Sequence, residues 1–281
     1  MTAHKENNFF KSVGIVGLGL IGGSLAKAFS SRGIKIFGFD KSVDCIAEAA
    51  ESFIFEGITD NLNEFVKFDP DLIYICLPVN AALEFLDFLA KKNVKTFVTD
   101  ACSTKSSICK KAKNLNLNFI GGHPIAGKEV SGFENSDESL FSGAYHILID
   151  SEDKKFLNLL KDLHELIGMR VKIMDIERHD KIFGLISHFP HLIAFSLIDF
   201  VEIENSQALN FTGGGFRDFT RIAKSNPVMW SDIFFDNSKI LNEYIDSYIN
   251  ELLKWKKAIL SEDYTLMKNM ISKVKKLRES L

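Results

Sequence analysis

The sequence predicts an α/β N-terminal half over residues 1–174 and an all-α C-terminal half over residues 175–281. In the first half, short apolar runs typical of buried parallel strands alternate with helical patterns, as expected when helices cover both faces of a sheet. From Asp175 onward the apolar residues recur at helical spacing. A chain of 281 residues has ample core for two such domains.

A glycine-rich turn follows the first strand candidate, residues 12–16. Gly17, Gly19 and Gly22 form the pattern G-x-G-x-x-G, and a helical pattern begins directly afterwards. In this pattern the glycines allow a tight turn, the close approach of a pyrophosphate and close packing of helix on strand. The free N–H groups at the helix start, around Leu20 and Ile21, favour binding of phosphate. These features predict a Rossmann-type dinucleotide-binding domain, in preference to a glycine-rich turn without a ligand.

The next strand candidate, residues 35–39, ends on Asp40. This position matches the spacing of roughly 20 residues expected for a carboxylate that binds the adenosine ribose. A carboxylate there accepts hydrogen bonds from a 2′-hydroxyl and repels a 2′-phosphate, so we expect NAD in preference to NADP. Lys41 and Ser42 follow and soften that preference.

Further strand candidates end on residues that carry chemistry. Residues 72–77 end at Pro78, residues 96–99 precede Ser103, and residues 119–120 lead to His123. Ligands gather at the carboxyl ends of the strands in open parallel sheets, so we expect Pro78 to contact the cofactor. Ser103 fits a substrate contact or a helix N-cap about equally well. Residues 145–149 and 170–174 read as the last strands of this alternation.

His123 lies between glycines and is followed by Pro124. The proline fixes the local chain direction and removes a donor, which predicts a shaped loop and not a continuing strand. Imidazole titrates near neutral pH and is suited to proton transfer. A lone loop histidine usually bonds only its neighbours, but the convergence at the sheet edge favours a catalytic role here.

The helical half contains two groups of polar residues within apolar surroundings. Residues 180–195 predict a long helix kinked at Pro190, with His188 and His191 on either side of the proline. One core histidine and one surface histidine remain an alternative to a functional pair. Arg217 and Arg221 are four residues apart and can share a helical face, which suits binding of a carboxylate. One of them could equally pair with Asp218 or Asp232.

The last helices predict packing and not chemistry. Asn226 followed by Pro227 reads as a helix cap, and a later helix carries apolar residues at spacings of four and three from Leu241 to Ile259. We expect a homodimer built on these helices.

Composition excludes several other classes. A formal net charge of −3 without a basic stripe argues against nucleic-acid binding. The N-terminus lacks the apolar core of a signal peptide, and the apolar run from Leu192 to Val201 is too short to span a bilayer. The four cysteines form no C-x-x-C pair, so we expect no metal site, no disulfide framework and a cytoplasmic location.

At this point the chain resembles a known family, prephenate dehydrogenase with its relative arogenate dehydrogenase, over nearly its whole length. The resemblance rests on a generic glycine motif and four specific segments, which are residues 14–25, 100–105, 122–132, 187–191 and 214–223. It implies oxidative decarboxylation of prephenate to 4-hydroxyphenylpyruvate, with NAD accepting the hydride, in tyrosine biosynthesis.

The resemblance also implies roles for individual residues. His123 would accept the proton of the ring hydroxyl, and Ser103 would bond the same hydroxyl or hold His123. His191 and Arg221 would bind a substrate carboxylate. Glu129 and Asp180 are expected at the substrate site as gating or ion-pairing residues.

Three alternatives stay open at the level of the sequence. Arogenate dehydrogenase acts on a substrate with an amino group in place of the side-chain keto group. A β-hydroxyacid-type dehydrogenase usually relies on a lysine in its helical half, which fits the histidines poorly. A non-catalytic NAD sensor would have no need of a proton acceptor. No appended regulatory domain is evident, so feedback by tyrosine would act at or near the active site.

Overall fold

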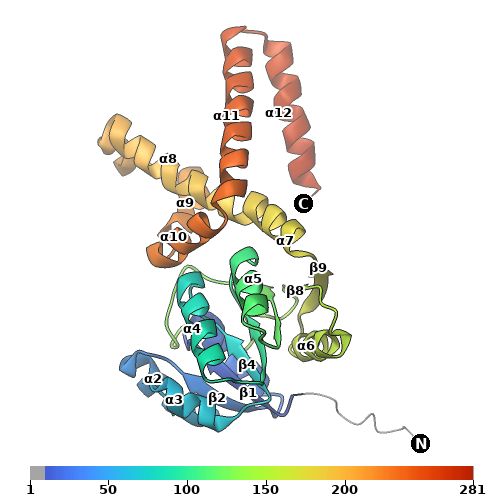
Figure 1. The fold of residues 1–281 in the computed structure, drawn as a ribbon. Helices are drawn as coiled ribbons and strands as arrows, with labels where there is room; N and C mark the ends of the chain where they lie inside the picture. The colour runs from blue at the N-terminus through green and yellow to red at the C-terminus, as the bar shows by residue number, and fades with distance from the viewer. Residues whose placement is uncertain (1–9, 281) are drawn as a thin grey trace, which may run out of the picture. The chain divides into compact units, whose positions relative to one another are not determined.

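The computed structural model describes residues 10–280, and it places a six-stranded parallel sheet in the N-terminal half (Figure 1). The strand order is β3-β2-β1-β4-β5-β6, so the chain reverses direction across the sheet between β1 and β4. The strands are β1 (Ser12–Val16), β2 (Lys35–Phe39), β3 (Phe55–Thr59), β4 (Leu72–Ile75), β5 (Phe97–Asp100) and β6 (Phe119–Ile120). The predicted Rossmann-type sheet is therefore confirmed.

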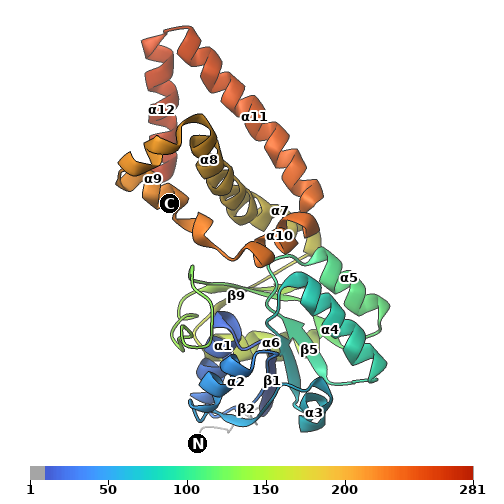
Figure 2. The ribbon, with the colours of Figure 1, turned by 90° about the vertical axis from the view of Figure 1, so that its left-hand side faces the viewer.

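Helices cover both faces of this sheet, as the continuous apolar strands require. They are α1 (Leu20–Ser30), α2 (Val43–Ala50), α3 (Leu62–Phe65), α4 (Val79–Lys91), α5 (Ser106–Asn114) and α6 (Lys154–Leu166), with a 3₁₀ turn at Val66–Phe68. Figure 2 shows α4 and α5 lying side by side, and both bury apolar side chains against one face. Helices α1 and α6 pack on the opposite face.

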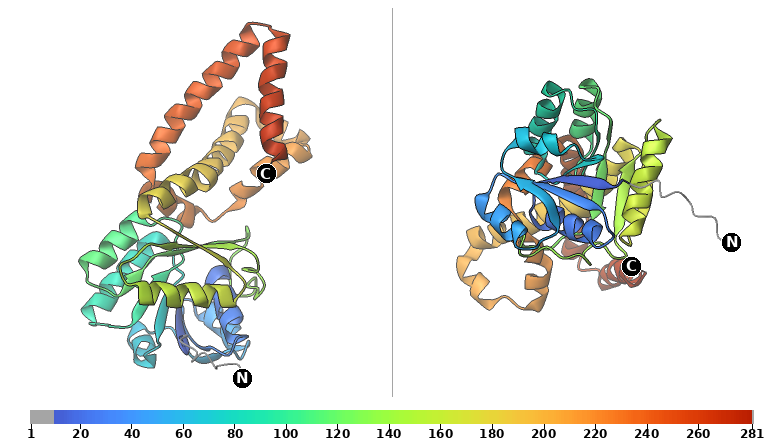
Figure 3. Two further views of the ribbon diagram at one scale, coloured as in Figure 1. Left: turned by 90° about the vertical axis from the view of Figure 1, so that its right-hand side faces the viewer. Right: turned by 90° about the horizontal axis from the view of Figure 1, so that it is seen from below.

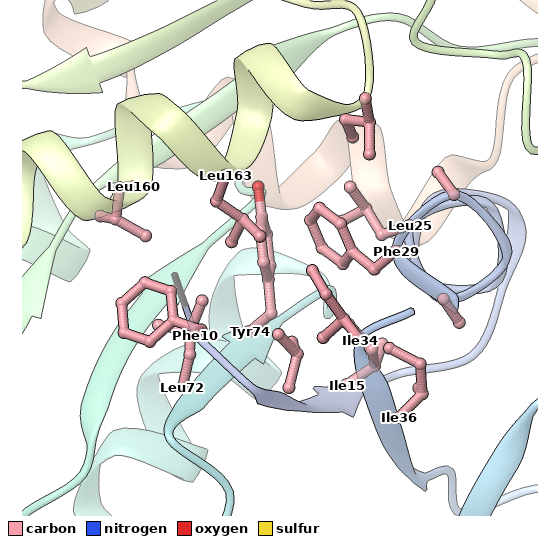
Figure 4. Close-up of a cluster of buried hydrophobic side chains, with 14 of the residues drawn as sticks. Phe10, Ile15, Leu25, Phe29, Ile34, Ile36, Leu72, Tyr74, Leu160 and Leu163 are labelled. Carbon is pink, nitrogen blue, oxygen red and sulfur yellow. The ribbon is translucent and has the colours of Figure 1, made fainter. Parts of the chain in front are cut away.

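In the core between α1, α6 and the sheet, a buried tyrosine hydroxyl pairs with a buried histidine. Figure 4 shows Leu160 and Leu163 of α6 near Tyr74 of β4 and Phe29 of α1. The Tyr74 hydroxyl is hydrogen-bonded to Nε2 of His164, with 3.0 Å between the two atoms. Nδ1 of His164 donates to the Leu160 carbonyl at 2.6 Å. The hydroxyl is thereby satisfied inside an apolar layer.

A second, three-stranded sheet corrects two predictions. It contains β7 (Gly122–Ile125), β8 (Tyr145–Ile149) and β9 (Arg170–Met174), with β7 antiparallel to β8. The last two strands therefore form a sheet of their own, against which α6 packs (Figure 3). His123 lies on β7 and not in a loop. Strand β7 is an edge strand, where Pro124 is tolerated because one side of the strand needs no donor.

The next helices are interrupted where the proline predicted a kink. Helix α7 (Ile176–Phe183) runs through a π-helical turn at Gly184–His188 into α8 (Phe189–Asn205). Pro190 occupies the first turn of α8, a position that needs no intrahelical donor. Regular α-helical bonding is therefore interrupted in the π turn that precedes the proline. The remaining segments are a 3₁₀ turn at Ser206–Phe211, α9 (Gly214–Thr220), a 3₁₀ turn at Arg221–Lys224 and α10 (Pro227–Asp236).

The chain divides into two compact units, the first ending at Asn237 and the second beginning at Ser238. The first unit extends beyond the expected domain boundary at residue 174, because α7 and α10 bond to elements of the parallel-sheet domain. Asp232 of α10, for example, accepts hydrogen bonds from the amide nitrogen and the side chain of Asn80 at the start of α4, at 3.1 and 2.6 Å. Asn226 caps α10 as predicted, accepting from Met229 N at 3.1 Å.

The second unit contains α11 (Ser238–Leu260) and α12 (Tyr264–Glu279), which are joined by a short turn. The predicted apolar seam lies on α11, but half of its side chains remain exposed in the single chain, including Leu252 and Ile259.

One stretch within the described residues, Ile176–Phe211, is long and apolar enough by length and composition to span a membrane, with a mean hydropathy of 1.4 over 18 residues. The stretch contains the π turn and the buried polar residues His179, Asp180 and His188. Length and composition alone are weak evidence, because apolar helices of water-soluble proteins pass the same test.

Candidate active site

The glycine turn after β1 has the geometry of a pyrophosphate cradle. Gly17 has φ +93°, and a Cβ there would lie 2.5 Å from the Cys76 carbonyl oxygen. A Cβ on Gly22 would lie 1.8 Å from the Gly17 carbonyl oxygen. A Cβ on Gly19, by contrast, would meet nothing within 4 Å, and no side chain caps the start of α1. The space beside Gly19 and the free N–H groups at Leu20 and Ile21 fit a dinucleotide phosphate.

Asp40 stands at the end of β2 beside this turn. One carboxylate oxygen accepts from Leu18 N at 2.8 Å and the other from Ser42 N at 2.9 Å. These bonds fix the carboxylate and leave lone pairs on both oxygens for a ribose hydroxyl. Pro78 is exposed at the N-cap of α4, at the end of a neighbouring strand. Both predicted cofactor residues thus lie at the carboxyl edge of the sheet.

His123 on β7 is partly buried among aromatic rings. Its Nδ1 lies 2.9 Å from Nε2 of His179, and its ring contacts Phe183 edge-on at 5.0 Å between centroids. Burial, together with the nearby positive charge of Lys105, holds the pKa of His123 well below the ordinary value. Nε2 of His123 has no hydrogen-bond partner among residues 10–280. The ring is therefore neutral near pH 7 with one nitrogen free.

Asp180 holds His179 from the other side and is closed to ligands. Its Oδ1 lies 2.8 Å from Nδ1 of His179 and accepts from Lys105 N at 2.9 Å. Oδ2 accepts from the backbone and the hydroxyl of Ser106. Although burial alone would raise it, the pKa of Asp180 is lowered by the bonds from His179, Ser106 and Lys105. The carboxylate is 2% exposed with both oxygens engaged, so we reassign Asp180 from substrate contact to support.

Ser103 follows β5 between two buried residues and is itself half-buried. The N-cap alternative for this serine is wrong, because α5 begins only at Ser106. The first N–H groups of α5 are instead satisfied by Asp180 of α7. Within the described chain the Ser103 hydroxyl makes no hydrogen bond, which leaves it available to a ligand.

A buried ion pair that the sequence did not predict lies behind His123. Lys105 and Asp100 form it with both side chains fully buried. Nζ of Lys105 also donates to the Gly122 carbonyl at 2.6 Å, while Asp100 accepts from Gly122 N at 3.0 Å. The pair therefore hydrogen-bonds to both the carbonyl and the N–H of Gly122, the residue before His123. Asp100 and Lys105 both belong to the motif at residues 100–105, but their spacing in the sequence does not predict that they pair.

The histidines around Pro190 have separate surroundings. His191 is half-buried, stacks on Trp230 at 3.7 Å between centroids, and donates from Nδ1 to the Ser187 carbonyl at 2.9 Å. Nδ1 of His188 accepts from Asn237 at 3.1 Å, and burial lowers the pKa of His188 to about 4. Nε1 of Trp230 and Nε2 of His188 are buried without a hydrogen-bond partner among the described residues. Helix α10, expected only to pack, therefore holds a free donor at Trp230.

Arg221 and Glu129 form an ion pair that joins the start of a 3₁₀ turn to the segment after β7. Arg221 remains 58% exposed, so part of its guanidinium is open to another anion. Arg217 is exposed on α9, and the two arginines do not share one regular α-helix because α9 ends at Thr220. Arg221 thus pairs with Glu129 and not with Asp218 or Asp232, the partners considered from the sequence. Asp232 bonds to Asn80 instead.

A dinucleotide cradle and a neutral histidine with one free nitrogen define an oxidoreductase of the dinucleotide-dependent dehydrogenase class. The family model described as prephenate dehydrogenase, nucleotide-binding domain, matches residues 25–173. The model described as prephenate dehydrogenase, dimerization domain, matches residues 175–273. The chain belongs to the prephenate dehydrogenase family.

Three known proteins illustrate the likeness. A prephenate dehydrogenase of Lactococcus lactis is 34% identical over 96% of this chain and 77% of its own length. The structure of prephenate dehydrogenase from A. aeolicus with hydroxyphenyl propionate and NAD+ matches with a TM-score of 0.92 and 35% identity, over 98% of this chain and 99% of that chain. Arogenate dehydrogenase from Synechocystis matches with a TM-score of 0.81 and 27% identity, over 96% and 99% of the two chains.

Proposed function

We propose that this protein oxidises prephenate with NAD and releases carbon dioxide and 4-hydroxyphenylpyruvate, a step towards tyrosine. The observation that carries the proposal is the neutral His123, whose free Nε2 is the proton acceptor that this reaction needs. The family match and the Gly19 cradle support NAD as the oxidant. We place the reaction in the cytoplasm, in keeping with four free cysteines.

In this mechanism the chain positions the substrate and moves one proton. Bound NAD supplies the acceptor for the hydride from the ring carbon that bears the hydroxyl. His123 takes the hydroxyl proton on Nε2 as the carbon–hydrogen bond breaks, and Ser103 holds the same oxygen. The bond to the ring carboxylate then breaks, and its electron pair restores the aromatic ring. The phenolic oxygen regains the proton from His123, so no net proton is consumed.

Arg221 is the proposed anchor of a substrate carboxylate. His191 donates a hydrogen bond from Nδ1 to the Ser187 carbonyl, and burial lowers the pKa of His191. A neutral His191 offers only an acceptor at Nε2, so it binds a carboxylate only after protonation. Arg221 offers a guanidinium, the natural partner of a carboxylate, and Glu129 orients it. His191 and the Trp230 ring then line the same region.

Arg221→Ala should raise KM for prephenate about 10- to 100-fold, as for loss of a charged hydrogen bond, with kcat changed much less. Arg217→Ala is the matched control, because Arg217 is exposed and equally charged, and it should leave KM within about twofold. Steady-state kinetics with varied prephenate give both values. A loss confined to kcat in Arg221→Ala would show that Arg221 does not bind the ground-state substrate.

Arogenate is the second candidate substrate, favoured by the match to the Synechocystis enzyme. It differs from prephenate at the side chain and not at the oxidised ring, so His123 would act in the same way. Absorbance of NADH or NADPH, measured with each substrate and each cofactor, separates the possibilities. Turnover with prephenate and NAD supports the proposal. Preference for arogenate changes the substrate, and preference for NADP counts against the role of Asp40.

We also propose that the protein is a homodimer. The matching model is described as a dimerization domain, and α11 and α12 expose many apolar side chains. They include Ile249, Leu252, Leu253, Ile259, Ile271, Val274 and Leu277. Burial of such a surface against a second copy is a sufficient reason for association. Sedimentation equilibrium should give twice the chain mass, and a monomer at micromolar concentration would contradict this.

Tyrosine shares the hydroxyphenyl ring of the product, so we propose that any inhibition by tyrosine occurs at the substrate site. Inhibition kinetics should then be competitive with prephenate. A non-competitive pattern would place tyrosine elsewhere.

A further inference from the structure

His179 is the one residue in the described chain that hydrogen-bonds to the His123 ring, and it belongs to none of the motifs in the sequence. It lies fully buried on α7, with 2.9 Å from its Nε2 to Nδ1 of His123 and 2.8 Å from its Nδ1 to Asp180. The three side chains form a continuous line from the buried carboxylate to the free Nε2 of His123.

The position of each proton along this line follows from Asp180. An ionised carboxylate only accepts hydrogen bonds, and three donors at Lys105 and Ser106 keep Asp180 ionised. Nδ1 of His179 must therefore carry a proton, which leaves its Nε2 as an acceptor when the ring is neutral. That acceptor requires a proton on Nδ1 of His123. The lone pair of a neutral His123 then lies on Nε2.

We propose that His179 is a positioning residue that, held by Asp180, fixes His123 in the tautomer whose Nε2 accepts the substrate's proton. The catalytic part of this inference rests on the proposed function, whereas the tautomer is a property of the free protein. A free imidazole prefers the opposite tautomer, with the proton on Nε2, which would block proton acceptance. The contact therefore decides which nitrogen reaches the substrate.

The charged groups around the hydrogen-bonded series Asp180–His179–His123 fit the positioning role of His179. Lys105, paired with Asp100, is a positive charge that acts on both rings, and His188 of the π turn acts on His123. Lys105 disfavours a proton on either histidine, while Asp180 favours one on His179. When Nε2 of His123 gains a proton, the Nδ1–H bond to His179 directs the new positive charge towards Asp180. The positive charge on His123 is thus stabilised while its Nε2 carries the substrate's proton.

Two substitutions of His179 separate positioning from simple packing. The glutamine amide reaches the place of Nε2, so His179→Gln can still accept from His123 but loses Asp180. The asparagine amide reaches only the place of Nδ1, so His179→Asn can bond Asp180 but not His123. We expect kcat to fall about 10²-fold in His179→Asn, with KM for prephenate and affinity for NAD within about twofold. His179→Gln should recover kcat to within about tenfold of wild type.

The tautomer is measured directly from ¹⁵N histidine spectra of the free wild-type protein, with the His123 signals assigned by their loss in His123→Asn. We expect His123 protonated on Nδ1 in wild type and in His179→Gln, and on Nε2 in His179→Asn. A wild-type spectrum with the proton on Nε2 overturns the inference, even if neither variant folds. Equal kcat in wild type and His179→Asn overturns it as well.

The same experiment keeps the two proposals apart. A wild-type protein that shows the Nδ1 tautomer but does not oxidise prephenate or arogenate contradicts the proposed function and leaves the positioning by His179 in place. Turnover of prephenate combined with the Nε2 tautomer supports the proposed function and contradicts the positioning by His179.

Discussion

His123→Asn should lower kcat for prephenate by about 10²–10⁴-fold, the usual effect of removing a general base. The asparagine amide occupies the place of Nδ1 and can still donate to His179, but no basic atom remains where Nε2 met the substrate hydroxyl. KM for prephenate should change little, because Arg221 is untouched. Steady-state kinetics and titration of NAD binding measure these values. A variant with wild-type kcat would remove His123 from the mechanism.

The pH profile of the wild-type enzyme tests the same role from another side. The active form of His123 is neutral, and its pKa lies well below the ordinary value of 6.5 because the ring is buried. Activity should therefore stay level as pH falls through 6.5 and decline only at lower pH, where His123 takes up a proton. A decline centred at or above 6.5 would show a histidine in an ordinary, solvated setting.

Lys105→Met should reduce the free energy of unfolding by about 3–5 kcal/mol, the cost of leaving one partner of a buried ion pair. Both side chains are fully buried, and Asp100 raises the pKa of Lys105 although burial alone would lower it, so Lys105 is charged in the folded protein. Methionine keeps the length of the side chain but removes the charge and the bond to the Gly122 carbonyl. Urea unfolding measures the loss.

The double variant Lys105→Met with Asp100→Asn is the control for this effect. Asparagine removes the unpaired charge and retains an oxygen that can accept from Gly122 N. The double variant should therefore be more stable than Lys105→Met alone. Equal loss in the single and double variants would mean that Lys105 stabilises the fold by packing and not by its charge.

Most of the parallel sheet could be predicted from the sequence, because its strands are short apolar runs and its first turn requires glycine. Strand β3 was missed because Phe55–Thr59 contains Glu56 and Gly57, lies at the sheet edge and lacks a continuous apolar run. Strand β7 was missed because Pro124 resembles a turn signal. Only its edge position in a second sheet makes that proline acceptable.

Some candidate residues, such as Asp40, could be placed at strand ends from the sequence, but the contacts among the candidate residues could not be predicted. The sequence pointed to His123 and Asp180 separately, and nothing in their spacing shows that His179 lies between them. The contact depends on how α7 packs beside α5 and β7, which is a tertiary property. The Lys105–Asp100 pair and the free Nε1 of Trp230 were hidden for the same reason.

The most direct test of the account is the stoichiometry of products from prephenate and NAD. Wild-type protein should release one NADH, one carbon dioxide and one 4-hydroxyphenylpyruvate for each prephenate consumed, and His123→Asn should release the same products far more slowly. NADH formed without carbon dioxide would contradict oxidative decarboxylation, and no NADH from either prephenate or arogenate would contradict the proposed activity itself.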